Sequence, residues 1–192
     1  YEALLERVEH SSVPAPVESL FALGTRAADA LVNPVGANES PLEQLSDSMF
    51  AEVVGRMRGF LLFREEGSFV QPDPAFFYGL ARARGDSADV AFFHGWMATR
   101  DSATSVWPIY VEQQTDEAGC TRFGSGALVS AYAVWSSFDQ RYPQRYVEYV
   151  LEELGAIERE LTEGTCACGE REDVLRELRA FDQRFPDAAI AP

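Results

Sequence analysis

Apolar residues recur every three or four positions throughout the last third of the chain. Three segments show this spacing, and short polar stretches join them. The spacing is typical of helices that bury one face, and helices with short connections pack antiparallel. The sequence therefore predicts a C-terminal antiparallel three-helix unit. Its apolar positions are Leu128, Tyr132, Trp135, Phe138 and Tyr142, then Val147, Val150, Leu151, Leu154, Ile157 and Leu161, then Val174, Leu175, Leu178, Phe181 and Phe185.

Helix signals also cover most of the chain before this unit. An apolar face begins at Val17, and its helix is expected to end at Asn33-Pro34. The segment Ser40 to Glu43 resembles a capping box with proline at the first helical position, so it predicts a helix start. Asp73-Pro74 and Asp86 to Asp89 mark two further starts. The buried stripe expected in the helix opened by the capping box is Leu42, Leu45, Met49 and Val53.

The segment between residues 59 and 70 is ambiguous. Its apolar run, Phe60 to Phe63, is too short for periodicity to separate a strand from a buried helix. Because two strands alone are marginally stable, we expect mostly helix or irregular structure, with one short hairpin near residues 59–70 as the alternative. The predicted fold class is therefore all-α, an irregular multi-helix bundle that forms a single helical domain over residues 1–192.

The net charge of the chain restricts its partners. Thirty-one acidic residues face sixteen basic ones, which gives a formal net charge of −15, and all sixteen are arginine. A surface of this sign repels nucleic acid and an anionic membrane face, whereas a basic protein partner is electrostatically allowed. The favoured interpretation of the acidity is that it keeps the protein soluble. Because the chain has no lysine, it can form neither a lysine Schiff base nor a P-loop. It also lacks the run of about 18 apolar residues that a transmembrane helix needs.

The three cysteines are expected to meet at one end of the bundle. Cys120 precedes the helix predicted from about Gly126 to Tyr142, whereas Cys166 and Cys168 follow the next helix. An antiparallel hairpin brings the start of the first helix to the end of the second. One disulfide is therefore predicted, from Cys120 to Cys166 or to Cys168, and its loop of about 50 residues would contribute roughly 3–4 kcal/mol.

Other states of the cysteines remain open at this stage. One alternative is a redox-active bridge between Cys166 and Cys168. A second is a zinc or copper(I) site formed by the three thiols and a histidine, and a third is that all three are reduced core residues. A lone Cys-x-Cys is a weak metal signal, so no metal site is predicted. The disulfide predicts an oxidising compartment, periplasmic or secreted, with a cytoplasmic protein as the alternative.

No catalytic or cofactor motif is present. The chain lacks His-Glu-x-x-His, Glu-x-x-His, Gly-x-Ser-x-Gly and the glycine-rich nucleotide-binding patterns. His94 is a weak candidate for a general base, or for a thiol dyad with Cys120, but a structural histidine is the favoured interpretation. Carboxylate pairs such as Glu65-Glu66 and Glu152-Glu153 are expected to be solvated. No catalytic residue and no cofactor are therefore predicted.

Two helix ends carry charged or hydroxyl groups of interest. The loop Gly124 to Gly126 is able to hold an anion on its backbone N–H groups, although Ser125 as a simple N-cap is favoured. In the last helix, Asp182 and Glu177 are expected to pair with Arg179 or Arg184.

Tyrosine, tryptophan and arginine, which are enriched at binding hot spots, are concentrated near the junction of two predicted helices. We therefore expect a non-enzymatic protein that acts outside the cytoplasm and binds a protein partner or ligand through a face of the bundle. The alternatives are an enzyme that uses His94 and Cys120 or a carboxylate pair in a cleft, and a structural or assembly subunit. The candidate binding patch comprises Trp135, Arg141, Tyr142, Arg145, Tyr146 and Tyr149.

Overall fold

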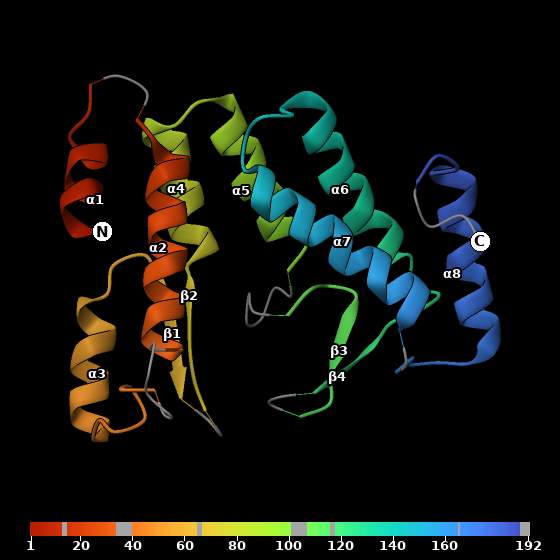
Figure 1. Ribbon diagram of the computed structural model, residues 1–192, viewed down its shortest axis with the longest axis horizontal. Coiled ribbons are helices and arrows are strands. Elements are labelled where there is room, and N and C mark those ends of the chain that lie inside the picture. Colours follow the sequence, from red (N-terminus) through yellow and green to blue (C-terminus); the bar gives the residue numbers. More distant parts are fainter. Residues whose placement is uncertain are drawn as a thin grey trace. The chain divides into compact units, whose positions relative to one another are not determined.

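The computed structural model describes residues 1–12, 15–33, 40–64, 67–100, 107–115, 118–164 and 166–188. Within these ranges the chain forms eight helices, 61% helix in all, and two small antiparallel sheets (Figure 1). The predicted predominance of helix is confirmed. The chain divides into two compact units, Tyr1–His94 and Gly95–Pro192. No helix in the described ranges has the length and hydropathy that a bilayer span requires.

The first unit consists of helices around one hairpin. Its strands pair antiparallel, with Leu62 opposite Val70, and α2 packs against both β2 and α4. The elements are α1 (Glu2–Glu9), α2 (Val17–Val32), α3 (Asp47–Arg56), β1 (Phe60–Arg64), β2 (Ser68–Pro72), α4 (Pro74–Arg84) and most of α5 (Ser87–Ala98).

Phenylalanine rings form the centre of the first unit. The ring of Phe21 in α2 meets Phe77, Phe92 and Phe93 edge to face, at centroid distances of 5.4, 5.5 and 5.3 Å. All four side chains are buried. Edge-to-face pairs add to the stabilisation from apolar burial because the positive edge of one ring meets the negative face of another. This cluster therefore joins α2, α4 and α5.

The hairpin and α3 differ from the favoured sequence interpretation. Residues 60–64 and 68–72 pair as the hairpin that was the alternative, so the expectation of helix or irregular structure is wrong. The helix predicted to open near Ser40 begins at Asp47 instead, because Ser46 caps it and the Ser40 hydroxyl accepts the Leu42 N–H within a local turn. The predicted stripe is not buried along α3, where Met49 is 53% exposed.

The second unit combines a smaller hairpin with three long helices. Helix α6 packs against both α7 and α8, and α6 and α7 run in opposite directions (Figure 1). The buried residues of α6 include Leu128, Trp135 and Phe138 from the predicted apolar face. The elements are β3 (Val111–Gln113), β4 (Gly119–Thr121), α6 (Ala127–Arg141), α7 (Val147–Glu163) and α8 (Arg171–Arg184).

Two features of the second unit were not predicted. Pro143 is a signal for a helix start, but α7 begins at Val147, since Tyr146 occupies the left-handed region at φ 52° and forms its N-cap. The apolar run from Val106 to Val111 fits either a strand or a helix, and its last residue begins β3, which pairs with β4. Val106 itself lies outside the described residues.

Candidate functional site

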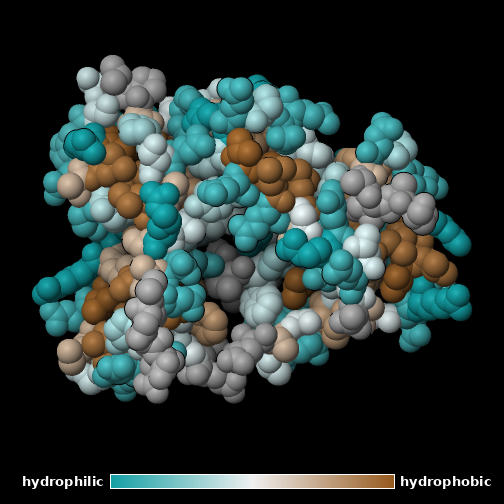
Figure 2. Space-filling view, in the orientation of Figure 1, coloured by the Kyte–Doolittle hydropathy of each residue, from teal (hydrophilic) through white to brown (hydrophobic). Residues whose placement is uncertain are grey.

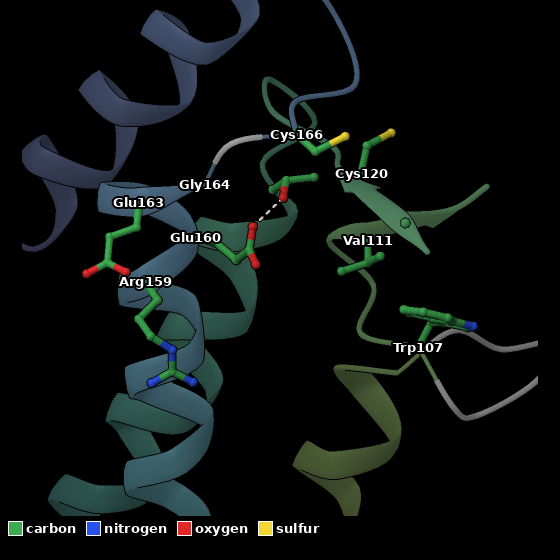
Figure 3. Close-up of a pocket in the computed structure, with 10 residues that line it drawn as sticks. Trp107, Val111, Cys120, Arg159, Glu160, Glu163, Gly164 and Cys166 are labelled. Atoms are coloured by element: carbon green, nitrogen blue, oxygen red, sulfur yellow. Dashed lines mark hydrogen bonds between the residues drawn. The ribbon is translucent and has the colours of Figure 1, made fainter. Parts of the chain in front are cut away.

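A pocket of about 390 Å³ lies in the second unit, between the β3–β4 hairpin and the last turns of α7 (Figure 3). Glu160 points from α7 toward the hairpin, and Trp107 lies on the opposite side. The walls thus combine an aromatic ring, carboxylates and sulfur. The pocket is lined by Trp107, Val111, Gly119, Cys120, Thr121, Arg159, Glu160, Glu163, Gly164 and Cys166.

The hairpin wall is fixed to α7 by a buried hydroxyl. Thr121, only 3% exposed, donates its hydroxyl hydrogen to the Glu160 carboxylate. Charge-assisted hydrogen bonds are stronger than neutral ones, so this contact holds one carboxylate at the pocket wall. Gly119 permits the close pairing of the strands, because a Cβ at this position would overlap the Val111 side chain and lie 3.0 Å from the Glu112 carbonyl oxygen.

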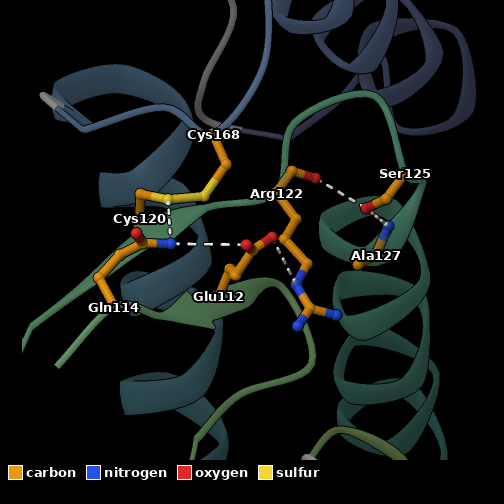
Figure 4. A network of polar contacts seen from close by, with 7 residues as sticks. All are labelled: Glu112, Gln114, Cys120, Arg122, Ser125, Ala127 and Cys168. Carbon is orange, nitrogen blue, oxygen red and sulfur yellow. Dashed lines mark hydrogen bonds and ion pairs between the residues drawn. A yellow bond between two sulfur atoms is a disulfide. The ribbon is translucent and has the colours of Figure 1, made fainter. Parts of the chain in front are cut away.

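A disulfide joins Cys120 on β4 to Cys168, beyond the end of α7. Their Cα atoms are 5.4 Å apart, although the residues are separated by 48 positions. This is one of the two pairings that the sequence allows, and Cys166 remains a free and exposed thiol. The Gln114 amide nitrogen lies 3.5 Å from Cys120 Sγ (Figure 4). The antiparallel course of α6 and α7 explains why these distant cysteines meet at one end.

Charged residues also flank the hairpin outside the pocket. Arg122 and Glu112 form an ion pair with an N–O distance of 3.7 Å across β3 and β4 (Figure 4). Both side chains are about half exposed, so water screens this pair and it contributes little stability. Glu160 and Glu163 in the lining face only one basic residue, Arg159. The pocket is therefore acidic on balance.

The segment that leads into the hairpin is anchored by a second ion pair. The Arg100 guanidinium donates to both carboxylate oxygens of Glu153 in α7, and both side chains are largely buried. Backbone bonds extend the anchor, since the Ile109 N–H donates to the Thr99 carbonyl at 3.0 Å. Burial, followed by the nearby Glu153 carboxylate, raises the pKa of Tyr110 to about 12. Tyr110 is therefore neutral at physiological pH.

Glu177 occupies the anion position considered for the glycine loop. Its carboxylate accepts the N–H of Gly126 at 2.7 Å and that of Val129 at 3.4 Å, and the side chain is 1% exposed. Gly126 has a φ of +78°, a left-handed conformation that glycine adopts without strain. The expected pairing of Glu177 with Arg179 or Arg184 is therefore wrong, because the carboxylate caps α6 instead. Ser125 contributes its hydroxyl oxygen as acceptor for a neighbouring N–H, one residue before the cap (Figure 4).

The candidate binding patch does not form one surface. Trp135 and Tyr146 are buried, at 0% and 1% exposure, so they belong to the core. The exposed part is reduced to Arg141, whose guanidinium lies 5.3 Å from the Tyr142 ring centroid, with Arg145 and Tyr149 half-buried. On the face shown in Figure 2, hydrophobic residues lie in separate groups among hydrophilic ones. The predicted residues therefore provide no continuous exposed surface.

Within the described residues, His94 is not part of a catalytic group. Its side chain is exposed on α5, with the ring 6.1 Å from that of Tyr78. The proposed thiol dyad with Cys120 is contradicted, because the Cys120 sulfur is bonded to Cys168. Glu153 binds Arg100 rather than standing solvated beside Glu152, and Glu65-Glu66 lies outside the described residues. Among the described residues, no group of three His, Cys, Asp or Glu side chains is arranged to hold a metal ion.

The cysteine side of the pocket was predicted from the sequence, whereas the side formed by Trp107 and the α7 glutamates was not. The cysteines were expected at this end of the bundle, but Trp107, Glu160 and Glu163 were not singled out. One signal for the glutamates was available: both lie in the last turns before Gly164, so the argument that brings Cys166 to Cys120 brings them there as well.

Comparison with known proteins adds no assignment. No protein-family model, curated protein or solved structure matches this chain. The function is therefore argued from the pocket and its surroundings.

Proposed function

We propose that this protein is a non-catalytic binding protein outside the cytoplasm, and that its pocket takes a basic side chain from a protein partner. The observation that carries the proposal is the position of Trp107 opposite the Glu160 carboxylate across one cavity, whose lining also includes Glu163. An arginine or lysine side chain matches this arrangement, because its alkyl stem packs on an aromatic ring while its charge meets the carboxylates.

The size of the pocket supports a side chain as the occupant. Ligand pockets generally range from about 300 to 1,000 Å³, and this cavity of about 390 Å³ is at the small end. Such a volume suits one long side chain and its adjoining backbone. A partner that inserts one basic residue would make its remaining contacts on the surrounding surface.

The charge of the chain supports a basic partner. The formal net charge of −15 attracts a basic protein from a distance and raises the rate of encounter. The pocket then supplies the local complement, since two lining carboxylates outnumber the single Arg159 guanidinium. Long-range and short-range electrostatics therefore favour the same class of partner.

The chemistry of the lining supports binding over catalysis. The described lining residues include no histidine to serve as a general base. The Cys120 sulfur is held in a disulfide. That disulfide also favours an oxidising location, periplasmic or secreted, because structural disulfides persist there.

The test is a titration with a short peptide that contains one arginine, acetyl-Gly-Arg-Gly-amide, followed by the NMR signals of the protein. We expect shifts at the Trp107 indole N–H and at the amides of β4 and the end of α7. Glu163→Gln should weaken binding about two- to fivefold, the range for one exposed charge pair. Trp107→Ala should weaken it as well.

Two controls make the test specific. Glu152→Gln removes an equal charge from an exposed position of α7 that does not line the pocket, so its affinity should equal that of the wild type. The peptide acetyl-Gly-Glu-Gly-amide should not shift the pocket signals. Equal binding of the two peptides, or shifts confined to residues outside the pocket, would refute the proposal.

A further inference from the structure

The three cysteines surround one short parallel pairing of the backbone. Thr121 in β4 pairs with Ala167 in an isolated parallel bridge. The Thr121 N–H donates to the Cys166 carbonyl at 2.8 Å, and the Cys168 N–H donates to the Thr121 carbonyl at 2.8 Å. The segment from Cys166 to Cys168 thus lies beside β4 like a short additional strand.

This register places all three cysteine side chains on one face. Side chains alternate along a strand, and residues paired in a parallel register point the same way. Cys120 precedes Thr121 by one residue, as Cys166 precedes Ala167, so these two cysteines stand opposite each other. Cys168 shares the face because it follows Cys166 by two positions. Cys120 therefore has a cysteine neighbour on each side of the bridge.

The bonded neighbour of Cys120 lies within the range for a disulfide, and the strand spacing predicts the same for the other neighbour. The bonded pair, Cys120 and Cys168, has a Cα–Cα distance of 5.4 Å. Adjacent strands are spaced by about 4.8 Å, which lies within the Cα–Cα range for disulfides of about 4.4 to 6.8 Å. Cys166 is exposed and free, and Figure 3 shows its side chain next to that of Cys120 at the pocket. A nucleophile and a disulfide thus share one site.

We propose that these residues form a thiol–disulfide exchange site in which Cys166 displaces Cys168 from Cys120. The Cys166 thiolate attacks Cys120 Sγ, the bond between Cys120 and Cys166 forms, and the bond between Cys120 and Cys168 breaks. Cys168 leaves as a thiolate and takes up the proton that Cys166 released. One disulfide is present before and after, so the step consumes neither oxidant nor reductant.

The two pairings are expected to be close in free energy. The loop closed by the exchanged disulfide is two residues shorter than the loop of 48 positions, and loop entropy changes only with the logarithm of length. The backbone bonds of the bridge hold the segment in place in either pairing. Exchange moves the free thiol from Cys166, which lines the pocket, to Cys168. This step is independent of the binding proposed above.

The experiment maps the free thiol of the wild-type protein. The protein is held at pH 8 without reductant, samples are quenched in acid to protonate thiolates, and the free thiol is then alkylated during denaturation. Peptide fragmentation between Cys166 and Cys168 locates the label. We expect label on both Cys166 and Cys168. The ratio of the two labelled forms should reach a constant value, and repeated incubations should give the same value. Label on Cys166 alone at every time would overturn the proposal.

Two variants sharpen this result. Cys168→Ser should form a disulfide between Cys120 and Cys166 and show no free thiol, as Cys166→Ser should through Cys120 and Cys168. Two free thiols in Cys168→Ser, under conditions that leave none in Cys166→Ser, would also overturn the proposal. If Cys168→Ser fails to fold, the distribution of label in the wild type decides the matter.

Discussion

Both units have an apolar core, but the second adds a disulfide and largely buried polar contacts between residues distant in sequence. In the first unit, the ring of Phe21 joins three other phenylalanine rings, and the buried Asp89 carboxylate accepts the N–H of Asp86. In the second, the contacts described above join residues about 50 positions apart: Cys120 with Cys168, Glu177 with Gly126, and Arg100 with Glu153.

The two kinds of contact differ in how strongly they depend on redox state and pH, and those that depend strongly are called conditional contacts. Apolar burial changes little with redox state or moderate pH, because it depends on the area removed from water. A disulfide is lost on reduction, and the charge of a capping carboxylate strengthens its interaction with the helix start. The pocket lies in the second unit, so its shape depends on the conditional contacts. The first unit should tolerate conditions that loosen the pocket.

The largest expected effect tests the aromatic cluster. Phe21→Ala leaves a cavity among rings that cannot fully collapse, and it should destabilise the first unit by about 3–5 kcal/mol. Hydrogen exchange measured by mass spectrometry resolves the two units by their peptides. The loss of protection should be greater in residues 1–94 than in the second unit. Phe69→Ala, at a 39% exposed position of β2, is the control and should change stability far less. Equal losses in both units would break the comparison.

Reduction of the disulfide tests the opposite side of the comparison. Dithiothreitol should destabilise the second unit by about 3–4 kcal/mol, because the unfolded chain regains the freedom of a long loop. Urea unfolding followed by tryptophan fluorescence reports on this unit, since Trp96, Trp107 and Trp135 all lie within it. Cys120→Ser should behave like the reduced wild type. An equal loss of exchange protection in residues 1–94 on reduction would contradict the separation of the two units.

A smaller effect is expected from the capping carboxylate. Glu177→Gln keeps the shape and the acceptor oxygen but removes the charge at the start of α6, so stability should fall by about 1–2 kcal/mol. The measurement is urea unfolding at low and high salt, where the loss should persist at high salt because the site is buried. Glu152→Gln, an exposed change on α7, should leave the unfolding midpoint near that of the wild type. A loss as large in this control would attribute the effect to net charge.

Local signals account for the parts of the fold that were predicted. Asp73 and Pro74 open α4 as expected, with the Asp73 carboxylate accepting the Ala75 N–H, and α2 ends before Asn33. These features depend on a few neighbouring residues. Ser40 shows the limit of such signals, because the same hydroxyl that suggests a helix cap instead stabilises a turn several residues before the helix.

Long-range pairing accounts for what was missed. Strands β3 and β4 have three residues each, too few for a periodic pattern, and β4 also pairs with the segment around Ala167. Periodicity likewise placed Trp135 on a helix face without showing what covers it. The cysteine cluster was accessible because it followed from the direction of two long helices. Trp107 carries no such local or topological signal.

The smallest effect concerns the start of α8, where Asp173 accepts the Glu170 N–H at 3.0 Å and pairs with Arg176. The backbone hydrogen bond, followed by Arg176, lowers the pKa of Asp173 below its ordinary value of 3.8. A depressed native pKa contributes stability above the unfolded-state pKa and loses it as the pH falls through the native value. Asp173→Asn should therefore be less stable than the wild type at pH 7, with the difference vanishing in acid. Urea midpoints between pH 2 and pH 7 measure it, and Asp182→Asn, exposed on the same helix, is the control. A difference between wild type and Asp173→Asn that grows on acidification would show that the carboxylate does not stabilise α8. The disulfide would then remain as the redox-dependent contact of the second unit, and Glu177 as its charge-dependent contact.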